Sequence, residues 1–235
     1  MKLTDIHCHM LPHVDDGPGK VEEARELLEE SYKQGVRRII VTPHYRPEMF
    51  EPSMKRVCYS YNHLRGIAAD IGIELRLGCE CYRNEKIVRH MKNRNRPTMA
   101  GSKYVLIEFS PGDLFQVLRN YVYDMVTNGF KPIIAHVERY LCCAEMEKIQ
   151  ELKNMGACIQ VNASAVLGDD GRMTKKYCAQ LMKADLIDFI ASDAHDTKTR
   201  KPNLGKCAAY VSRKMGKPYA RRIFVTNPEN ILKKR

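Results

Sequence analysis

The chain has 235 residues, which is enough for one substantial hydrophobic core, and α/β barrels of roughly this length often form a single domain. Hydrophobic residues make up 44% and charged residues 29%, the composition of an ordinary globular protein rather than a disordered or fibrous one. No apolar run approaches the ~20 residues of a membrane-spanning helix, and the N-terminus does not resemble a signal peptide. We therefore expect a cytoplasmic protein with no membrane insertion.

The cysteine content and the net charge limit the cellular compartment and the kinds of partner that we expect. Nine cysteines, an odd number scattered along the chain, fit reduced thiols better than a disulfide framework. The formal net charge of +11 is compatible with nucleic-acid binding, attraction of phosphorylated substrates, or simple solubility. The basic residues concentrate at 89–96 and 214–222, without the interleaved exposed aromatics that single-strand binders need. We expect a solvated surface or a docking site for an anionic protein, and no nucleic-acid partner.

Apolar, β-branched runs alternate with segments of helical periodicity along the whole chain. Seven strands are predicted, at 3–7, 38–42, 73–77, 104–109, 132–136, 157–162 and 186–191. Helices are predicted at 20–34, 53–71, 114–128, 144–155, 173–184 and 204–215, with a short one at the C-terminus. Four of them stop at a glycine, which is a common helix end. This alternation predicts a parallel sheet of βαβ units, and hence a single domain over 1–235 folded as a closed or nearly closed α/β barrel.

The segment Asp5-Ile6-His7-Cys8-His9 places two imidazoles two residues apart after a short apolar run. Because residues i and i+2 of a strand point to the same face, we expect His7 and His9 to lie side by side. Two neutral imidazoles suit zinc, iron or manganese, and the following acidic turn, Asp15-Asp16, adds oxygen ligands. Taken alone, the pair fits a metal site and a surface without function equally well.

Potential metal ligands recur at the ends of the predicted strands. In (β/α) barrels the carboxyl ends of the strands converge on one mouth, where the functional residues lie. An acid that closes an apolar strand, such as Glu108, is costly unless it is paired or bound to metal. Chance alone is a poor explanation for His, Asp or Glu at six of seven strand ends. The residues are His7 and His9 after the first strand, His44, Glu80, Glu108 and His136 after the next four, and Asp193 and His195 after the seventh.

So many ligands exceed the three protein groups that a single catalytic zinc takes. With Asp16 added, the set suits two or three metals bridged by a carboxylate and a water, an arrangement that clamps the attacking and leaving oxygens of an in-line displacement. This favours phosphoester chemistry, with metal-assisted amidohydrolysis as the nearest competitor. Arg139 and Arg200 support the phosphate interpretation because arginine binds phosphate oxygens in a bidentate manner. Arg46, just past His44, is a weaker third candidate.

Eight motifs extend over nearly the whole chain. They are DIHCHMLPHVDDGP at 5–18, TPHYRPEMF at 42–50, GCE at 78–80, LIEFS at 106–110, AHVERY at 135–140, QVNASAVLG at 160–168, SDAHDTKTRKPNL at 192–204 and NPENIL at 227–232. With these motifs the chain resembles the PHP (polymerase and histidinol phosphatase) superfamily. Within that superfamily it is similar to the bacterial tyrosine-protein phosphatases of capsule and exopolysaccharide gene clusters.

The resemblance implies a distorted (β/α)7 TIM-like barrel of the PHP type. It implies a trinuclear cluster of Mn²⁺, with iron or zinc as alternatives, held by Asp16 and the eight strand-end residues, with Glu108 as the bridging ligand. Arg139 and Arg200 would hold the phosphate. The implied substrate is phosphotyrosine on a tyrosine autokinase of polysaccharide synthesis and export, hydrolysed by a metal-activated hydroxide. The chain departs from the family pattern at Val137, where proline is expected, and at Cys8, where serine is usual; Cys8 should face away from the metals.

Two other functions remain open at this stage. A small-molecule PHP phosphatase, such as a histidinol-phosphatase, would use the same cluster, although a chain without room for capping insertions favours a protein substrate. A nucleic-acid-associated PHP module is motivated only by the net charge. A third possibility is rejected: Cys207 and Arg213 match the C-x5-R spacing of cysteine-dependent phosphatases, but the segment lacks glycine and lies inside a predicted helix.

Overall fold

Parallel strands dominate the computed structural model, which describes residues 1–233. The strands are β1 (Leu3–Asp5), β2 (Val36–Val41), β3 (His44–Tyr45), β4 (Glu74–Leu77), β5 (Glu80–Tyr82), β6 (Tyr104–Glu108), β7 (Lys131–Ile134), β8 (Cys158–Asn162) and β9 (Phe189–Ala191). They form a three-stranded sheet in the order β1-β2-β4 and a six-stranded sheet in the order β3-β5-β6-β7-β8-β9. Every pairing between these strands is parallel, as the sequence predicts.

The two sheets are parts of one barrel because two strand lines are each interrupted once and continue beyond the predicted bounds 38–42 and 73–77. β3 continues the line of β2 after Thr42-Pro43, and β5 continues that of β4 after Gly78-Cys79. Proline has no amide hydrogen for the ladder, so a break at Pro43 is expected. Hydrogen bonds bridge the breaks, since Thr42 N donates to Cys8 O at 2.9 Å and Glu80 N to Pro43 O at 3.1 Å. Seven strand lines result, and the predicted barrel-like α/β fold is confirmed.

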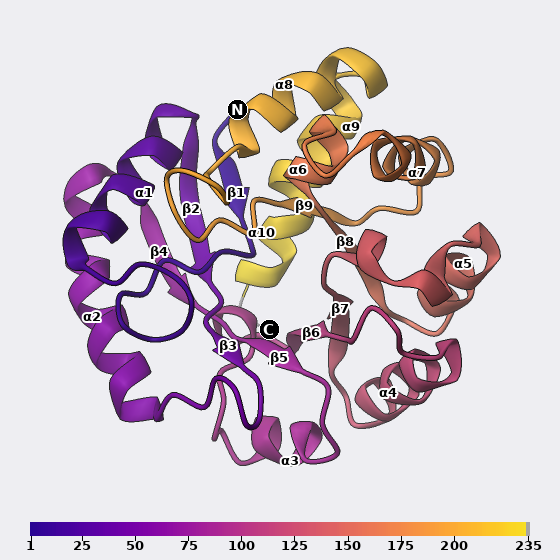
Figure 1. The fold of residues 1–235 in the computed structure, drawn as a ribbon, viewed down its shortest axis with the longest axis horizontal. Coiled ribbons are helices and arrows are strands. Elements are labelled where there is room, and N and C mark those ends of the chain that lie inside the picture. Colours follow the sequence, from indigo (N-terminus) through magenta and orange to yellow (C-terminus); the bar gives the residue numbers. More distant parts are fainter. Residues whose placement is uncertain (234–235) are drawn as a thin grey trace.

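The barrel closes between β1 and β9 only at its carboxyl end. There Cys8 and Ala194 form a parallel bridge, His9 N donates to Ala194 O at 2.8 Å and Asp193 N donates to His7 O at 2.9 Å. Below this point a π-helical turn (Arg222–Thr226) contacts both strands, and α10 (Asn227–Leu232) contacts β1. Figure 1 shows α10 as the yellow ribbon between β1 and β9. The barrel is therefore distorted, with helical segments filling the gap.

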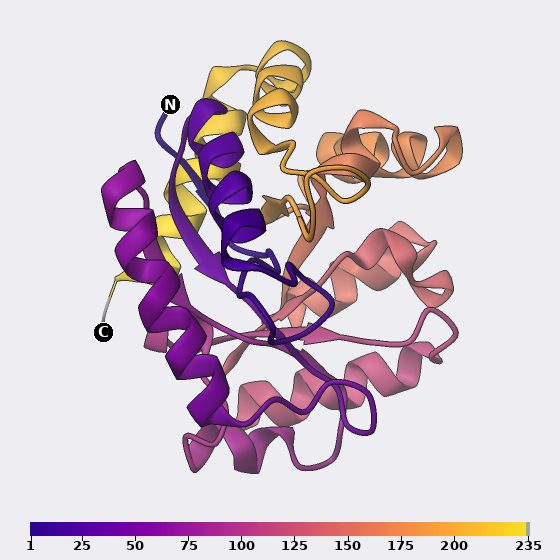
Figure 2. The same ribbon diagram turned by 60° about the vertical axis from the view of Figure 1, so that its left-hand side comes forward.

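Helices surround the strands in the order expected of βαβ units. They are α1 (Val21–Lys33), α2 (Met54–Ile71), α3 (Ile87–Lys92), α4 (Phe115–Thr127), α5 (Met146–Asn154), α6 (Ala163–Leu167), α7 (Arg172–Lys183), α8 (Leu204–Met215), α9 (Lys217–Arg221) and α10. Figure 2 shows α1 and α2 side by side against the outer face of β2 and β4. The signals at the ends of α2 are clear: Ser53 Oγ accepts a hydrogen bond from Arg56 N, and Gly72 stops the helix at a φ of 94°. No helix among residues 1–233 is long and apolar enough to cross a membrane.

Strand alternation sorts the core into an inner and an outer set. Tyr104 and Leu106 of β6, with Phe189 and Ala191 of β9, belong to a buried cluster that also contains Ile231 of α10. The intervening residues of the same strands belong to a larger cluster that includes the helices. Because side chains alternate with a period of two, the next inward positions after these residues are 108 and 193. The same alternation that places apolar side chains inside the barrel therefore places the carboxylates of Glu108 and Asp193 at its mouth.

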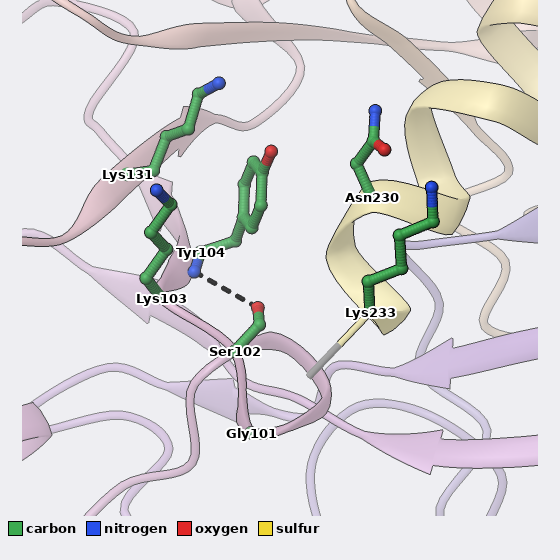
Figure 3. Close-up of a pocket in the computed structure, with 7 residues that line it drawn as sticks. All are labelled: Gly101, Ser102, Lys103, Tyr104, Lys131, Asn230 and Lys233. Carbon is green, nitrogen blue, oxygen red and sulfur yellow. Dashed lines mark hydrogen bonds between the residues drawn. The ribbon is translucent and has the colours of Figure 1, made fainter. Parts of the chain in front are cut away.

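A pocket with three lysines lies at the opposite, amino end of the strands. Lys131 begins β7, and Lys103 and Tyr104 stand at the start of β6. With Lys233 they line a cavity of about 370 Å³, in which Tyr104 N donates to Ser102 Oγ at 3.2 Å (Figure 3). This part of the positive charge is therefore remote from the predicted ligands.

Candidate metal centre

The histidine pair that follows β1 has the expected geometry. His7 and His9 are fully buried, and their Nε2 atoms lie 3.3 Å apart. The strand ends at Asp5, but the bridge at Cys8 keeps the next residues extended, and the two rings lie with their centres 5.4 Å apart. The predicted side-by-side arrangement is confirmed. The other seven predicted ligands come together around this pair: Asp16, His44, Glu80, Glu108, His136, Asp193 and His195.

Glu80 occupies the centre of the cluster. Its Oε2 lies 3.0 Å from His9 Nε2 and 3.2 Å from His7 Nε2, while Oε1 lies 2.9 Å from His136 Nε2. Glu108 is farther from the imidazoles, with 3.9 Å to His44 and 4.0 Å to His136. The resemblance implies Glu108 as the bridging ligand, which stays a prediction; Glu80 is the carboxylate that lies nearer to the imidazoles. The reason is that β5 places Glu80 under the histidines, whereas Glu108 lies at the rim with its side chain 15% exposed.

Asp193 connects the cluster to the two predicted phosphate-binding arginines. Its Oδ1 lies 3.4 Å from His7 Nε2. Its Oδ2 accepts hydrogen bonds from Nη2 of Arg139 and Nη2 of Arg200, each at 3.0 Å. Both guanidinium groups remain about two-fifths exposed, at 40% and 38%. The structure therefore brings the two arginines together at the mouth, where an incoming anion would meet them.

Asp16 forms the outer edge of the cluster. Its Oδ1 lies 3.3 Å from His195 Nε2 and 3.6 Å from His44 Nε2, and its side chain is 39% exposed. The α-carbon of Gly17 packs against the backbone of His9. A Cβ at this position would lie 2.4 Å from His9 O. Glycine is therefore required at this position for the acidic turn to fold back over the histidines.

The donor atoms form three overlapping groups, and the atoms within each group lie within 4.8 Å of one another. The groups are His9, Asp16, His44 and His195; His7, His9 and Glu80; and His44, Glu80 and Glu108. Several buried atoms of the cluster make no hydrogen bond of acceptable geometry among the described residues: His44 Nδ1, Glu80 Oε2, Glu108 Oε2, Asp193 Oδ1 and His195 Nε2. Unpartnered buried polar atoms are costly, so this set fits bound cations. Imidazole and carboxylate ligands suit manganese, iron or zinc.

The protonation equilibria differ among the donors. Against the effect of burial, Glu80 raises the pKa of His7 and Asp15 raises that of His9. Burial and the nearby His9 lower the pKa of His44 to about 4, and burial lowers the pKa of His136. Against the effect of burial, His7 and His44 hold the pKa of Glu80 well below its usual range. Burial and the adjacent Glu80 raise the pKa of Glu108 to about 7. His44, His136 and Glu80 are thus in the deprotonated forms that bind metal at neutral pH.

Asp15, which the acidic turn offered as an oxygen ligand, and Gln160 instead orient the histidines through hydrogen bonds. Asp15 Oδ2 accepts a hydrogen bond from His9 Nδ1 at 2.7 Å and another from His44 N at 2.8 Å. Gln160 Oε1 lies 3.1 Å from His7 Nδ1 and accepts from His136 N at 2.9 Å. With Nδ1 as the donor in each ring, Nε2 of both His7 and His9 is left as the ligand atom.

The same support continues along β8. Gln160 Nε2 donates to Asn162 Oδ1 at 2.8 Å, and Asn162 Nδ2 donates to Asp193 Oδ2 at 2.9 Å. Tyr140 OH, which accepts from Phe109 N, lies 3.2 Å from His136 Nδ1. No role was predicted from the sequence for Gln160 and Asn162. The sequence feature that could have indicated them is a pair of amide side chains at positions i and i+2 of an otherwise apolar strand.

The cysteines near these motifs are buried and inert. Cys8 is fully buried on the other face of the chain, its Sγ is 3.9 Å from Ile40 O, and burial raises the pKa of its thiol. Cys207 is fully buried inside α8, and burial raises its pKa as well. Both expectations from the sequence are confirmed. A thiolate nucleophile at Cys207 would need an exposed, electropositive surrounding that this helix does not offer.

The weaker candidate Arg46 lies on a loop beside the cluster. Its guanidinium carbon is 4.3 Å from the centre of the Tyr82 ring. The loop is fixed by Arg46 N and Phe50 O at 2.8 Å, and Phe50 stacks on His44 with ring centres 5.3 Å apart. Arg46 therefore lies at the edge of the mouth, and a role in substrate binding remains a prediction.

The chain is similar to known proteins over nearly its whole length. Residues 3–233 match the family model described as capsular polysaccharide synthesis, CpsB/CapC. The chain is 33% identical over 238 residues to the tyrosine-protein phosphatase CpsB of Streptococcus pneumoniae, covering 98% of each protein. It is 33% identical over 201 residues to the tyrosine-protein phosphatase YwqE of Bacillus subtilis strain 168, covering 84% of this chain and 79% of that one.

One solved structure supports the same assignment. It comes from a study of YwqE from Bacillus subtilis and CpsB from Streptococcus pneumoniae as unique metal-dependent tyrosine phosphatases. The TM-score is 0.90 at 29% identity, with 98% of this chain and 94% of that chain covered. The resemblance stated from the motifs is thereby confirmed, and the chain belongs to the CpsB/CapC family of PHP-type proteins.

Proposed function

We propose that this protein is a metal-dependent protein-tyrosine phosphatase. Its substrate would be phosphotyrosine on a tyrosine autokinase of polysaccharide synthesis and export. The observation that carries the proposal is the junction at Asp193, whose carboxylate faces His7 on one side and both Arg139 and Arg200 on the other. Support comes from relatives that are tyrosine-protein phosphatases over nearly the whole chain.

We propose that the cluster holds three metal ions, with Mn²⁺ as the native metal. The ligands would be His7, His9, Asp16, His44, Glu80, Glu108, His136, Asp193 and His195. Support comes from the three overlapping donor groups and the unpartnered buried atoms. When bound, such ions polarise phosphoryl oxygens and lower the pKa of a coordinated water. Hard oxygen donors mixed with imidazole are compatible with Mn²⁺ and do not exclude iron or zinc.

The protein's own groups have three tasks in this reaction. Arg139 and Arg200 would bind the non-bridging phosphate oxygens and neutralise charge that grows in the transition state. Asp193 fixes both guanidinium groups at 3.0 Å, so they are oriented before the substrate arrives. Asp15 and Gln160 hold the tautomers of His9 and His7. Neither Cys8 nor Cys207 takes part, since both are fully buried.

We further propose that the chain works as one catalytic domain in the cytoplasm. The cysteines support a reducing compartment, because all nine are free thiols. Cys79 and Cys81 even have their sulfur atoms 3.4 Å apart without a bond between them.

The first test is removal of metal followed by substitution of Arg139. Treatment with a chelator should abolish hydrolysis of a phosphotyrosine peptide, and added Mn²⁺ should restore it. Arg139→Ala should lower kcat/KM by about 10²–10³-fold, since one oriented donor to a developing charge is lost. Arg213→Ala is the matched control: it removes an exposed arginine of the rejected C-x5-R motif and should keep full activity.

Two results would contradict the proposal. One is full turnover of phosphotyrosine peptide by metal-free protein. The other is a kcat/KM for histidinol phosphate that exceeds the value for phosphotyrosine peptide, which would make the chain a small-molecule phosphatase.

A further inference from the structure

An apolar groove lies directly beside the catalytic mouth. The cavity measures about 510 Å³ and runs between the segment 138–144 and α7. Arg139 lines this groove and also lines the cavity of about 400 Å³ that contains Asp193 and Arg200. The groove is therefore continuous with the proposed phosphate site through a single side chain.

Large apolar side chains on both walls of the groove face solvent. Leu141 is 79% exposed on one wall and Met173 is 77% exposed on the other. Side chains of this size are usually buried, and their exposure on two sides of one groove marks a place where another apolar group gains by binding. Leu141 is held in place by a short 3₁₀ turn (Leu141–Cys143) and by the hydrogen bond from its N to Pro111 O at 3.2 Å.

The groove is already formed in the free protein. Tyr177 of α7 donates its hydroxyl to Cys143 O, which ties the helix to the opposite wall. Its ring and Ala144 continue the apolar lining. Lys176 and Gln180 of α7 give the groove a polar rim. An apolar floor inside a polar rim is the arrangement of a binding site for a single apolar anchor.

We propose that this groove receives an apolar side chain of the phosphoprotein substrate, placed two or three residues from the phosphotyrosine. The proposal rests on the phosphatase function and adds a sequence preference to it. An extended peptide advances ~3.3 Å per residue, so its second and third neighbours lie about 7–10 Å from the phosphotyrosine, and the groove borders the arginine that would hold the phosphate. Leu141 and Met173 are then specificity-determining residues, separate from those that hold the phosphate.

The test compares substrates with and without a flanking apolar residue. Phosphotyrosine peptides carrying Leu at one position from −3 to +3 are measured against the same peptides with Asp or Gly there, and against p-nitrophenyl phosphate. The unmodified protein should favour Leu at one of the positions two or three residues away, by about tenfold in kcat/KM. Leu141→Ser with Met173→Ser should raise the KM of that peptide by about tenfold and erase the preference.

Two controls distinguish the loss of a peptide-binding groove from a general loss of enzyme activity. Tyr59→Ser removes a side chain that is 78% exposed on α2, which lies on the other side of the barrel from α7 (Figure 1), and should keep the preference. For the groove variant, the loss on the Leu peptide should exceed the loss on p-nitrophenyl phosphate at least fivefold. Equal losses on both substrates, or an active protein with no preference among the peptides, would contradict the proposed role of the groove. The proposed phosphatase function would still stand. Absence of any hydrolysis with Mn²⁺ present would contradict the proposed phosphatase function, and the proposed role of the groove would fail with it.

Discussion

Two of the proposed ligands stand at backbone positions that side-chain-bearing residues rarely adopt. His136 has a φ of 32° and Asp193 a φ of 52°, both in the left-handed region. Each such residue costs on the order of 1–3 kcal/mol and persists only where its surroundings hold it. Hydrogen bonds stabilise both conformations, since His136 N donates to Gln160 Oε1 and Asp193 N donates to His7 O. Strain of this kind concentrates at functional sites, which agrees with the role proposed for both residues.

Glu138 allows a test of burial at the scale of one residue. Its Oε1 accepts from Asn162 N at 2.9 Å, whereas its Oε2 is buried without a partner. Burial raises the pKa of Glu138 from 4.5 to about 7. Between these values the folded protein keeps a proton that the unfolded chain has lost, so the contribution to stability is complete below pH 4.5 and is lost as pH rises through 7.

Glu138→Gln should therefore raise the free energy of unfolding at pH 8, by up to about 3 kcal/mol, and should change it little near pH 4.5. The amide keeps an oxygen for Asn162 N and carries no charge to bury. Urea unfolding of metal-free protein at several pH values measures the difference. The exposed Glu147→Gln on α5 is the control and should show no such dependence. A Glu138→Gln gain that is the same at every pH would contradict this account.

At the scale of elements, β8 supports the metal centre without supplying a ligand. Its two inward amides connect His7, His136 and Asp193 through hydrogen bonds of 2.8 to 3.1 Å. Partners of this kind fix ring orientation and keep the ligand nitrogen available. Their removal should weaken metal binding even though every ligand remains in place.

Gln160→Leu is predicted to lower the affinity for Mn²⁺ by about 10–100-fold. Leucine has a similar volume, so the barrel interior stays filled while the acceptor for His7 Nδ1 disappears. Gln160→Glu keeps that acceptor and should retain most of the affinity, which makes it the matched variant. Titration of Mn²⁺ against a competing chelator gives both constants. Equal affinity of Gln160→Leu and the unmodified protein would show that β8 has no such role.

The elements also show where sequence reasoning succeeds and where it fails. The long amphipathic helices and the apolar strands were predicted because their periodicity extends over many residues. α3, α6 and α9 were missed because five or six residues are too few to show a period. The strand-end rule brought eight residues to one mouth, to which the acidic turn adds Asp16, but it did not identify the central carboxylate. Glu80 rather than Glu108 lies among the histidines because the break at Gly78-Cys79 sets the register of β5, and no sequence pattern reports that register.

At the scale of the whole molecule, the two ends of the barrel have different chemistry. The mouth holds the carboxylates, histidines and arginines, and the amino end holds the lysine-lined pocket of Figure 3. Exposed charges are screened beyond about 8 Å at physiological ionic strength. The net charge of +11 is therefore a poor guide to the site, and the local pair Arg139 and Arg200 is the relevant positive charge.

The C-terminal helix completes the barrel from the amino end. Ile231 of α10 is fully buried in the inner cluster with Ile6, Phe189 and Ala191. β1 and β9 share only one bridge, so this side chain fills space that a regular barrel would close with a strand pair. The inner apolar layer separates Ile231 from the ligands at the mouth.

Ile231→Ala should lower the free energy of unfolding by about 2–5 kcal/mol, because it removes buried methylene groups and leaves a cavity. Ile231→Val, which removes one methyl group, should cost only about 0.5–1.5 kcal/mol. The metal centre should survive both changes, so kcat/KM measured well below the unfolding temperature should stay within about twofold of the original value. Urea unfolding and steady-state assays on the same preparations measure the two quantities together. If activity falls in proportion to stability while the protein remains folded, the inner layer does not insulate the mouth from the C-terminal helix.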